Sequence, residues 1–280
     1  MSYKPLVLGT EVFSGDWGKG FSQDTAKKIL IFAYDKNIEE LDTANSYGKS
    51  NYVEKLIGNI IKKNKLKFNI SSKFKINLKK NYEIPNIISN LEKQLDNSIK
   101  FLNVERLETY YFHSGENNEF FIDEVWGYLE KRKKLGDIRN LGLSLKHELV
   151  IRNEIKQVIN SKNYNISKIQ TVLNIFSQES LNFVIPYCLK NKIEIYGRMP
   201  LAKGLLTGKY TSENDFEKKD PRKNNIFTKK ILHYRLNNSD LNLTKILNWP
   251  LNHVKKIIFS VKKIEQLEEI TNIKYENLNN

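Results

Sequence analysis

Short runs of β-branched and aromatic residues alternate with longer amphipathic stretches from one end of the chain to the other. Such alternation is typical of an α/β protein with a parallel sheet. Eight candidate strands are recognised, at residues 6–9, 39–42, 68–72, 107–112, 138–144, 168–173, 193–197 and 256–260. Eight strand–helix units predict a (β/α)8 TIM barrel, and 280 residues is an ordinary length for such a barrel as one domain, 1–280.

The stretches between the strands carry apolar residues at helical spacing. The two clearest stripes are Val53, Leu56, Ile57, Ile60 and Ile61, and Ile88, Leu91, Leu95, Ile99 and Leu102. Ser22 with Asp24 after it predicts a helix start, and Asn37 suits the left-handed conformation that follows a helix end. No G-x-G-x-x-G follows the first strand, which disfavours a Rossmann sheet. The polar segment 207–230 is predicted to be a functional loop or lid without regular structure.

The charge of the chain is strongly basic but evenly spread. Lys and Arg number 46 against 32 Asp and Glu, a net charge of +14, with no pattern typical of nucleic-acid binding. We expect no nucleic-acid partner, while an anionic partner such as a phosphorylated cofactor stays open. Cys188 is the only cysteine, so we expect no disulfide within the chain and no metal site. The N-terminus lacks a signal-peptide pattern and the longest apolar run, 29–34, is short, which predicts a cytoplasmic protein without a membrane partner.

Four polar residues fall where predicted strands end, the place where parallel barrels carry their chemistry. Asp42 ends the second strand, Tyr47 follows in its loop, Lys73 lies just past the third strand and His113 just past the fourth. Each alone also has an ordinary structural explanation, such as a helix cap, loop packing or a snorkelling ammonium. Their joint placement on three consecutive strand ends favours a shared site.

The chemistry of these four side chains suits protonation of a carbonyl oxygen. A close ammonium favours phenolate, so Lys73 is expected to lower the pKa of Tyr47, and Asp42 to hold Lys73 charged and oriented. His113 can donate to or accept from the oxygen that Tyr47 protonates. A protein side chain cannot supply the hydride that must reach the carbonyl carbon, so a nicotinamide cofactor is implied.

The chain resembles the aldo/keto reductase superfamily. The resemblance rests on "LDTANSYG", "SSKF", "YYFHS", "GDIRNLGLS", "IQTVLN", "MPLAKGLLTGKY" and "FSVKKIEQLEE", which run in order from about residue 6 to 270. It implies reduction of an aldehyde, ketone or sugar-type carbonyl to an alcohol, with Asp42, Tyr47, Lys73 and His113 as the catalytic tetrad and Tyr47 as general acid.

The resemblance also implies where the cofactor binds. Ser144 and Gln170 match positions for the nicotinamide carboxamide, and Leu201 and Gly204 match the pyrophosphate loop. Ser260, Lys262, Gln266 and Glu269 match the adenosine end. Lys262 or Lys263 facing a 2′-phosphate favours NADPH, with NADH possible.

The chain departs from the family pattern in several cofactor positions, among them "FS" at 259–260, where the family has a Pro-Gly pair. Leu145 and Ile270 stand where the family has Asn, and Arg198 stands where a Tyr stacks on the nicotinamide. The guanidinium of Arg198 can stack in that place, and a salt bridge at the barrel rim is the alternative.

The loops that would wall the substrate pocket are short. Only 114–119 separates the His113 strand from its helix, and we expect no long C-terminal loop over the site. The sequence therefore predicts an open, polar mouth edged by Trp17, Phe21 and Tyr47, for a small-molecule carbonyl such as a sugar or nucleotide sugar. We expect a monomer or a weak homo-oligomer.

Three other functions stay open at this point. One is a non-catalytic protein on the same fold that uses NADPH occupancy for regulation or partner docking. Another is nucleic-acid binding through the positive charge, which predicts a steep salt dependence. The third is a different barrel enzyme, such as a phosphate-handling isomerase or lyase, which leaves Tyr47 and Lys73 unexplained.

Overall fold

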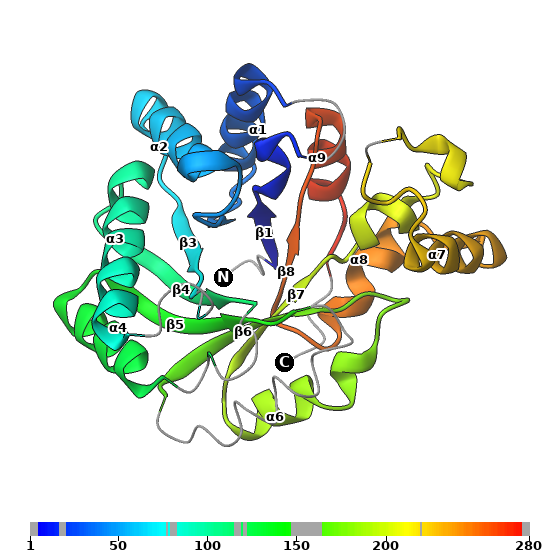
Figure 1. Ribbon diagram of the computed structural model, residues 1–280. Helices are drawn as coiled ribbons and strands as arrows, with labels where there is room; N and C mark the ends of the chain where they lie inside the picture. Colours follow the sequence, from blue (N-terminus) through cyan, green and yellow to red (C-terminus); the bar gives the residue numbers. More distant parts are fainter. Residues whose placement is uncertain are drawn as a thin grey trace.

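In the computed structural model, eight parallel strands close into a barrel in which each strand pairs with its neighbours in the chain and β8 pairs with β1 (Figure 1). The strands are β1 (Leu6–Gly9), β2 (Glu40–Asp42), β3 (Asn69–Phe74), β4 (Leu107–His113), β5 (Ile138–Ser144), β6 (Ile166–Val172), β7 (Glu194–Arg198) and β8 (Lys256–Phe259). The structure describes residues 5–16, 21–76, 78, 83–114, 119, 122–146, 164–218 and 220–275. The predicted (β/α)8 barrel is confirmed.

Helices surround the barrel (Figure 1). The α-helices are α1 (Gln23–Asp35), α2 (Tyr52–Asn64), α3 (Ile84–Leu102), α4 (Asp123–Leu135), α6 (Val184–Lys190), α7 (Ile226–Asn237), α8 (Leu243–Leu251) and α9 (Ile264–Thr271). Short 3₁₀ helices are η1 (Glu11–Ser14), η2 (Lys49–Asn51), η4 (Glu179–Leu181), η5 (Ala202–Thr207) and η6 (Glu213–Asp215). Ser22 caps α1 by accepting from the Thr25 amide at 3.0 Å, and Asn37 has a φ of 59°, as predicted. No helix in these ranges is long and apolar enough to cross a membrane.

Alternate strand residues point outward to the helices and inward to the barrel axis. The outward side chains, such as Leu41, Ile70 and Phe112, join one continuous apolar core with the buried helix stripes. Among the described residues, Val7, Tyr196 and Ile258 form a small apolar cluster inside the barrel. Many other inward positions are polar, so the interior is held together by hydrogen bonds and ion pairs as well as by packing.

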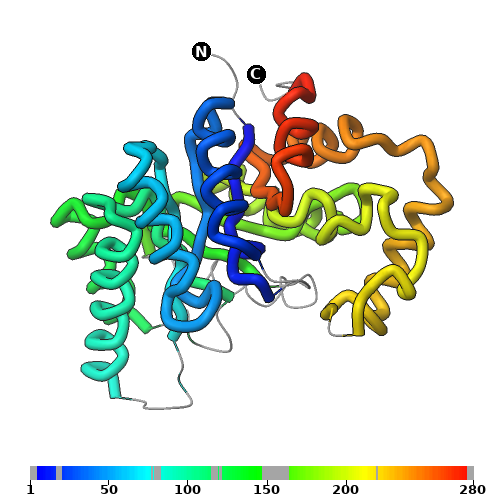
Figure 2. Tube along the Cα trace, turned by 90° about the horizontal axis from the view of Figure 1, so that it is seen from above, coloured from blue at the N-terminus to red at the C-terminus, as the bar shows by residue number. Residues whose placement is uncertain are grey.

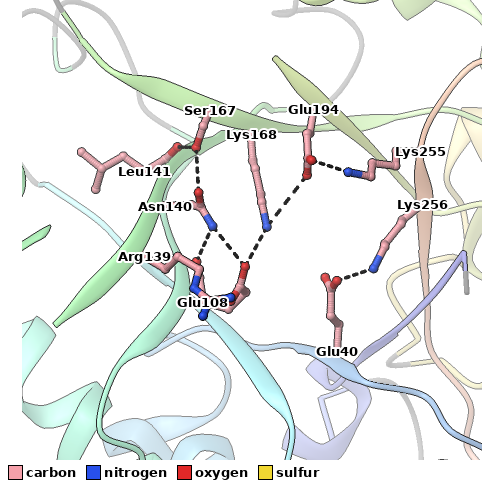
Figure 3. Close-up of polar contacts among 10 residues, drawn as sticks. All are labelled: Glu40, Glu108, Arg139, Asn140, Leu141, Ser167, Lys168, Glu194, Lys255 and Lys256. Carbon is pink, nitrogen blue, oxygen red and sulfur yellow. Dashed lines mark hydrogen bonds and ion pairs between the residues drawn. The ribbon is translucent and has the colours of Figure 1, made fainter. Parts of the chain in front are cut away.

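Charged side chains are paired at the end of the barrel where the strands begin (Figure 3). Lys168 lies 3.1 Å from Glu108 and 4.0 Å from Glu194. Lys256 bonds to Glu40, and Lys255 bonds to Glu194. Buried charges need such partners, because an isolated ion in the barrel would cost several kcal/mol. The charges at this end of the barrel are therefore paired with one another. The opposite end holds the contacts of Lys73 with Asp42 and Tyr47.

Two strands extend further than predicted, and this matters for the site. Lys73 lies within β3 and His113 is the last residue of β4, whereas the sequence placed both just past the strands. Lys73 pairs in register with Tyr111, and the next residue, Phe74, is fully buried. A charged residue often marks the end of a strand. Here the Lys73 ammonium is instead paired with Asp42 inside the barrel, so the strand continues past it.

The segment 207–230 was predicted to lack regular structure, and this is wrong in part. It contains η6, and α7 begins at Ile226, where the Asn225 side chain accepts from the Phe227 amide at 2.9 Å. Both η6 and α7 stand at one side of the barrel (Figures 1 and 2). The polar composition favoured a loop, whereas Asn225 in fact caps the first turn of α7.

Candidate active site

Three of the four predicted catalytic residues meet at the mouth formed by the carboxyl ends of the strands. Lys73 Nζ donates to Asp42 Oδ2 at 2.6 Å, to the Thr43 carbonyl oxygen at 2.7 Å and to Tyr47 Oη at 3.0 Å. Lys73 is fully buried and Asp42 is 4% exposed. Asp42 also accepts from Gln170 Nε2 at 2.5 Å through its second oxygen, Oδ1. The ammonium is thus held against the phenol by a fully partnered carboxylate.

His113 lies at the edge of this group. Its ring meets the Tyr47 ring edge-on with centroids 6.1 Å apart, and its Nδ1 lies 3.5 Å from Ser46 Oγ. Burial, together with the positive charges of Lys73, Lys75 and Arg198, lowers the pKa of His113 to about 2. The imidazole is therefore neutral throughout the physiological range, so one ring nitrogen donates and the other accepts.

The pKa of Tyr47 is raised, although the sequence predicted that Lys73 would lower it. Burial raises it most, because a phenolate loses hydration, and the nearby Lys73 only partly offsets this effect. For Lys73, burial favours loss of the proton, but Asp42 and Tyr47 outweigh it and the pKa is raised. At neutral pH the site therefore holds a protonated phenol beside an ammonium.

A neutral His113 has a direct spectroscopic consequence. We expect its ring NMR resonances to stay constant between pH 8 and pH 5, because its pKa lies far below this range. The spectrum of a His113→Gln variant assigns the signals. A midpoint near pH 6.5 for the signals that the variant loses would contradict the buried, neutral ring.

A cavity of about 670 Å³ extends from Asp42 and Tyr47 between β7, β8 and the segment after β7. Most of the predicted cofactor residues line it, namely Arg198, Leu201, Gly204, Ser260, Lys262, Gln266 and Glu269. Ile270, one of the departures from the family pattern, lines it too. Ser260 Oγ donates to the Gly9 carbonyl oxygen at 2.8 Å, and Gln266 Oε1 accepts from the Lys262 amide at 2.8 Å.

Ser144 and Gln170 do not line this cavity. They face each other in register at the ends of β5 and β6, and both are buried. Ser144 Oγ, Gln170 Oε1 and Arg198 Nε are buried without a hydrogen-bond partner. Buried polar atoms are normally satisfied, so unpaired donor and acceptor atoms on three adjacent strands form an incomplete polar site.

Arg198 reaches from the end of β7 across β6. Its Nη2 donates to the carbonyl oxygen of Leu145, directly after β5. The salt bridge considered from the sequence does not occur among the described residues. Instead, a main-chain contact fixes the guanidinium at the mouth, close enough to contribute to the low pKa of His113.

Basic residues after β7 contribute to the cavity, and the sequence reasoning missed them. Lys203, Lys209 and Arg222 line it together with Lys262. Burial lowers the pKa of both Lys203 and Lys262, and Arg222 lowers each further. For Lys209 and Arg222 the signal available was the number of Lys and Arg residues in the polar segment 207–230. Positively charged side chains that repel one another around one cavity favour the binding of an anion there.

Arg222 also holds this segment in place. Its guanidinium bonds to Asp220 at 2.9 Å and 2.6 Å and to the Lys203 carbonyl oxygen at 3.0 Å, and it lies over the rings of Tyr210 and Phe216. Its side chain therefore links η5 to the chain before α7. This segment forms a fixed wall of the cavity.

Of the two predicted substrate residues, Phe21 stacks on Phe13 with ring centroids 5.1 Å apart and does not line the cavity. Trp17 lies outside the described residues, as does most of the loop 114–119. Over the described ranges, no three His, Cys, Asp or Glu side chains are grouped to hold a metal ion.

The closed parallel barrel is a TIM barrel, and an ammonium, a phenol and a carboxylate are in contact at its mouth. The model of the Aldo/keto reductase family matches residues 5–279. The chain therefore belongs to this family, and the resemblance seen in the sequence is confirmed.

Known relatives agree with this assignment. The chain is 31% identical to "Aldo-keto reductase yakc [NADP(+)]" of Schizosaccharomyces pombe over 212 residues, covering 72% of this chain and 59% of the relative. It is 28% identical to "Aldo-keto reductase YhdN" of Bacillus subtilis over 223 residues, covering 78% and 64%. These matches span about three fifths of the length of the curated relatives.

Solved structures share the fold. The glycerol dehydrogenase AKR11B4 from Gluconobacter oxydans superposes with a TM-score of 0.78 at 22% identity, covering 98% of this chain and 88% of that one. The holo form of the aldo-keto reductase AKR11C1 from Bacillus halodurans gives 0.74 at 20% identity, covering 97% and 88%.

Proposed function

We propose that the protein is an NADPH-dependent oxidoreductase that reduces the carbonyl group of an aldehyde, ketone or sugar-type substrate to an alcohol. The observation that carries the proposal is the contact of Lys73 Nζ with Tyr47 Oη at 3.0 Å, backed by Asp42 inside the barrel. This arrangement presents a proton donor at the mouth of a cavity large enough for a dinucleotide. Membership of the aldo/keto reductase family supports the same chemistry.

The residues present fit a nicotinamide dinucleotide, which supplies a hydride when bound. The unpaired Ser144 hydroxyl and Gln170 oxygen suit the oxygen and nitrogen of a carboxamide. Leu201 and Gly204, with the positive Lys203 beside them, suit a pyrophosphate. Ser260, Lys262, Gln266 and Glu269 would hold the adenosine end, and Arg198 would pack beside the nicotinamide.

In this proposal the four residues at the mouth divide the proton chemistry. Tyr47 Oη gives its proton to the substrate oxygen, and Lys73 makes this easier by favouring the phenolate that remains. Asp42 keeps Lys73 charged and in place. The neutral His113 hydrogen-bonds the substrate oxygen and so orients the carbonyl group.

Charge around the cavity supports NADPH over NADH. Lys203, Lys209, Arg222 and Lys262 line one cavity, and each added phosphate on a ligand relieves their mutual repulsion. The polar mouth also supports a sugar or nucleotide-sugar substrate. Fluorescence titration of the purified protein with NADPH and NADH tests the proposal first. Binding of neither would leave the cavity without its proposed ligand and contradict the proposed function.

Lys262→Ala is expected to weaken NADPH binding by about tenfold or more and NADH binding by less than about twofold. A hydrogen bond from a charged group to the 2′-phosphate is worth about 1.5–3 kcal/mol, and NADH lacks that phosphate. The measurement is the same fluorescence titration on both cofactors.

Lys62→Ala serves as the matched control, because Lys62 is an exposed lysine on α2 away from the cavity. It should leave both affinities unchanged. Equal losses for NADPH and NADH in Lys262→Ala would move the 2′-phosphate contact to another residue, with Lys263 on the same wall next to be tested.

A further inference from the structure

Glu54 is a fully buried carboxyl group that the proposed reaction does not use. It lies in the first turn of α2, and none of its surface is exposed. Its Oε1 accepts from Ser72 Oγ at 2.6 Å, and its Oε2 accepts from Asn51 Nδ2 at 2.7 Å. Burying a carboxyl group is costly, and these two bonds offset the cost.

The two partners of Glu54 belong to the two segments that carry the proton chemistry. Ser72 directly precedes Lys73 on β3, and its side chain points outward while that of Lys73 points into the barrel. Asn51 ends the segment that leads from Tyr47 to α2. A single side chain therefore joins the strand of Lys73 to the loop of Tyr47, outside the barrel wall and away from the cavity.

The loop of Tyr47 needs such an anchor because its backbone is strained. Gly48, Ser50 and Asn51 have φ values of 70°, 54° and 57°. Glycine and asparagine adopt this left-handed conformation readily, whereas it costs a residue such as Ser50 roughly 1–2 kcal/mol. Backbone of this kind persists where its surroundings hold it. Besides the side chain of Glu54, the Val53 amide holds the loop by donating to the Tyr47 carbonyl oxygen at 3.2 Å.

The helix that carries Glu54 is itself fixed against its neighbour. Gly58 lies one turn further along α2, and a Cβ atom there would stand 1.8 Å from the Phe101 carbonyl oxygen of α3. The backbones of α2 and α3 are thus in direct contact. Glu54 projects from a helix that cannot shift toward α3. Its two hydrogen bonds therefore hold Ser72 and Asn51 in fixed positions relative to that helix.

We propose that Glu54 is a positioning residue that sets the separation of Lys73 Nζ and Tyr47 Oη by tying Ser72 to Asn51. The inference rests on the proposed function, since it concerns the same proton donor. Glu54 touches neither the cavity nor the reacting atoms. Its role is to keep the phenol within hydrogen-bond reach of the ammonium while ligands enter and leave.

Several groups face the Glu54 carboxyl group. They are Ser72 on β3, Tyr110 on β4, Ser98 on α3 and Asn51 beside α2, and the charge of Lys73 acts on the carboxyl group from inside the barrel. Burial raises the pKa of Glu54, while Ser72, Asn51, Ser98 and Lys73 oppose the shift. Replacing Glu54 itself would change this charge balance. The decisive variants therefore keep the carboxyl group and remove one of its two hydrogen-bond partners, Ser72 or Asn51.

Ser72→Ala and Ser98→Ala form a matched pair. Each removes one buried hydroxyl group near Glu54, but only Ser72 lies on the strand of Lys73 and donates to Glu54, while Ser98 Oγ has no hydrogen-bond partner among the described residues. We expect Ser72→Ala to lower kcat for aldehyde reduction by about tenfold or more, because small displacements of a catalytic group cost large factors in rate. We expect Ser98→Ala to leave kcat within about twofold, with the Kd for NADPH unchanged in both variants. Equal kcat values for the two variants would overturn the proposal.

The pH profile separates positioning from general loss of stability. Lys73 pulls the pKa of Tyr47 downward, so a looser pair should move the alkaline limb of the kcat profile to higher pH in Ser72→Ala and leave it unmoved in Ser98→Ala. An unshifted limb in Ser72→Ala would also overturn the proposal. If Ser72→Ala fails to fold, Asn51→Gly replaces it, because glycine adopts the φ of 57° readily and cuts the other end of the bridge.

These outcomes are distinct from failure of the proposed function. An unmodified protein that reduces no aldehyde and binds no NADPH would remove the proposed function and the inference together. An active protein that loses activity in Tyr47→Phe but is insensitive to Ser72→Ala and Asn51→Gly would remove the inference alone.

Discussion

Tyr47→Phe is expected to lower kcat for carbonyl reduction by about 10²–10⁴-fold while the Kd for NADPH changes little. The variant keeps the ring but removes the proton donor, which is the contribution that a positioned general acid makes. Burial raises the pKa of Tyr47 further above neutral pH, so the phenol carries the proton that a general acid must donate. Single-turnover kinetics at saturating NADPH measures the effect on the chemical step.

Tyr52→Phe is the matched control for this variant. Tyr52 is a half-buried tyrosine at the start of α2, five residues from Tyr47, and it does not line the cavity. It should leave kcat unchanged. A Tyr47→Phe variant that retains a rate within about tenfold of wild type would contradict the role of Tyr47 as general acid.

Lys73→Met is expected to lower the free energy of unfolding by about 3–5 kcal/mol and to abolish most activity. Removing one partner leaves Asp42 buried without its ammonium, and an unpaired buried charge is far more costly than the loss of the pair. Chemical denaturation at pH 7 measures the change. Because the pKa of Lys73 is raised in the folded state, the pair should stabilise the protein below about pH 10.4 and lose this contribution as pH rises further.

The double variant Asp42→Asn with Lys73→Met tests the cause of this loss. It should recover a large part of the stability but no activity, because no unpaired charge remains. Lys28→Met, which breaks an exposed pair with Asp24, should change stability little. Equal stabilities of Lys73→Met and the double variant would show that the buried charge is not what destabilises the single variant.

Much of the barrel and the core of the site followed from local patterns. The eight runs of strand-forming residues needed no tertiary information, because a buried parallel strand is apolar over several residues and is bounded by polar turns. Asp42 and Lys73 stood out for the opposite reason, as charges at the ends of such runs. Tyr47 lay in the loop between them. The Asp42–Lys73–Tyr47 contact was thus foreseeable in outline.

The electrostatics of the site were not foreseeable. The sequence predicts the attraction between Lys73 and Tyr47 but not how deeply the phenol lies, and burial decides the direction of the pKa shift. The same holds for His113, whose surroundings of Lys73, Lys75 and Arg198 come from two strand ends, those of β3 and β7. Phe21 was expected to line the pocket, but its ring stacks on Phe13 instead.

By itself the sequence determined the order of the strands, the helical faces that cover them and the residue types at the mouth, since these follow from local periodicity and from which side chains tolerate burial. Only the tertiary structure decided the contacts that join distant positions. Arg198 reaches Leu145 across 53 residues, Gln170 meets Asp42 across 128, and Glu54 bonds Ser72 across 18. No local pattern relates such residues, because the pairing of the strands and the packing of helices against them bring these residues within hydrogen-bond distance.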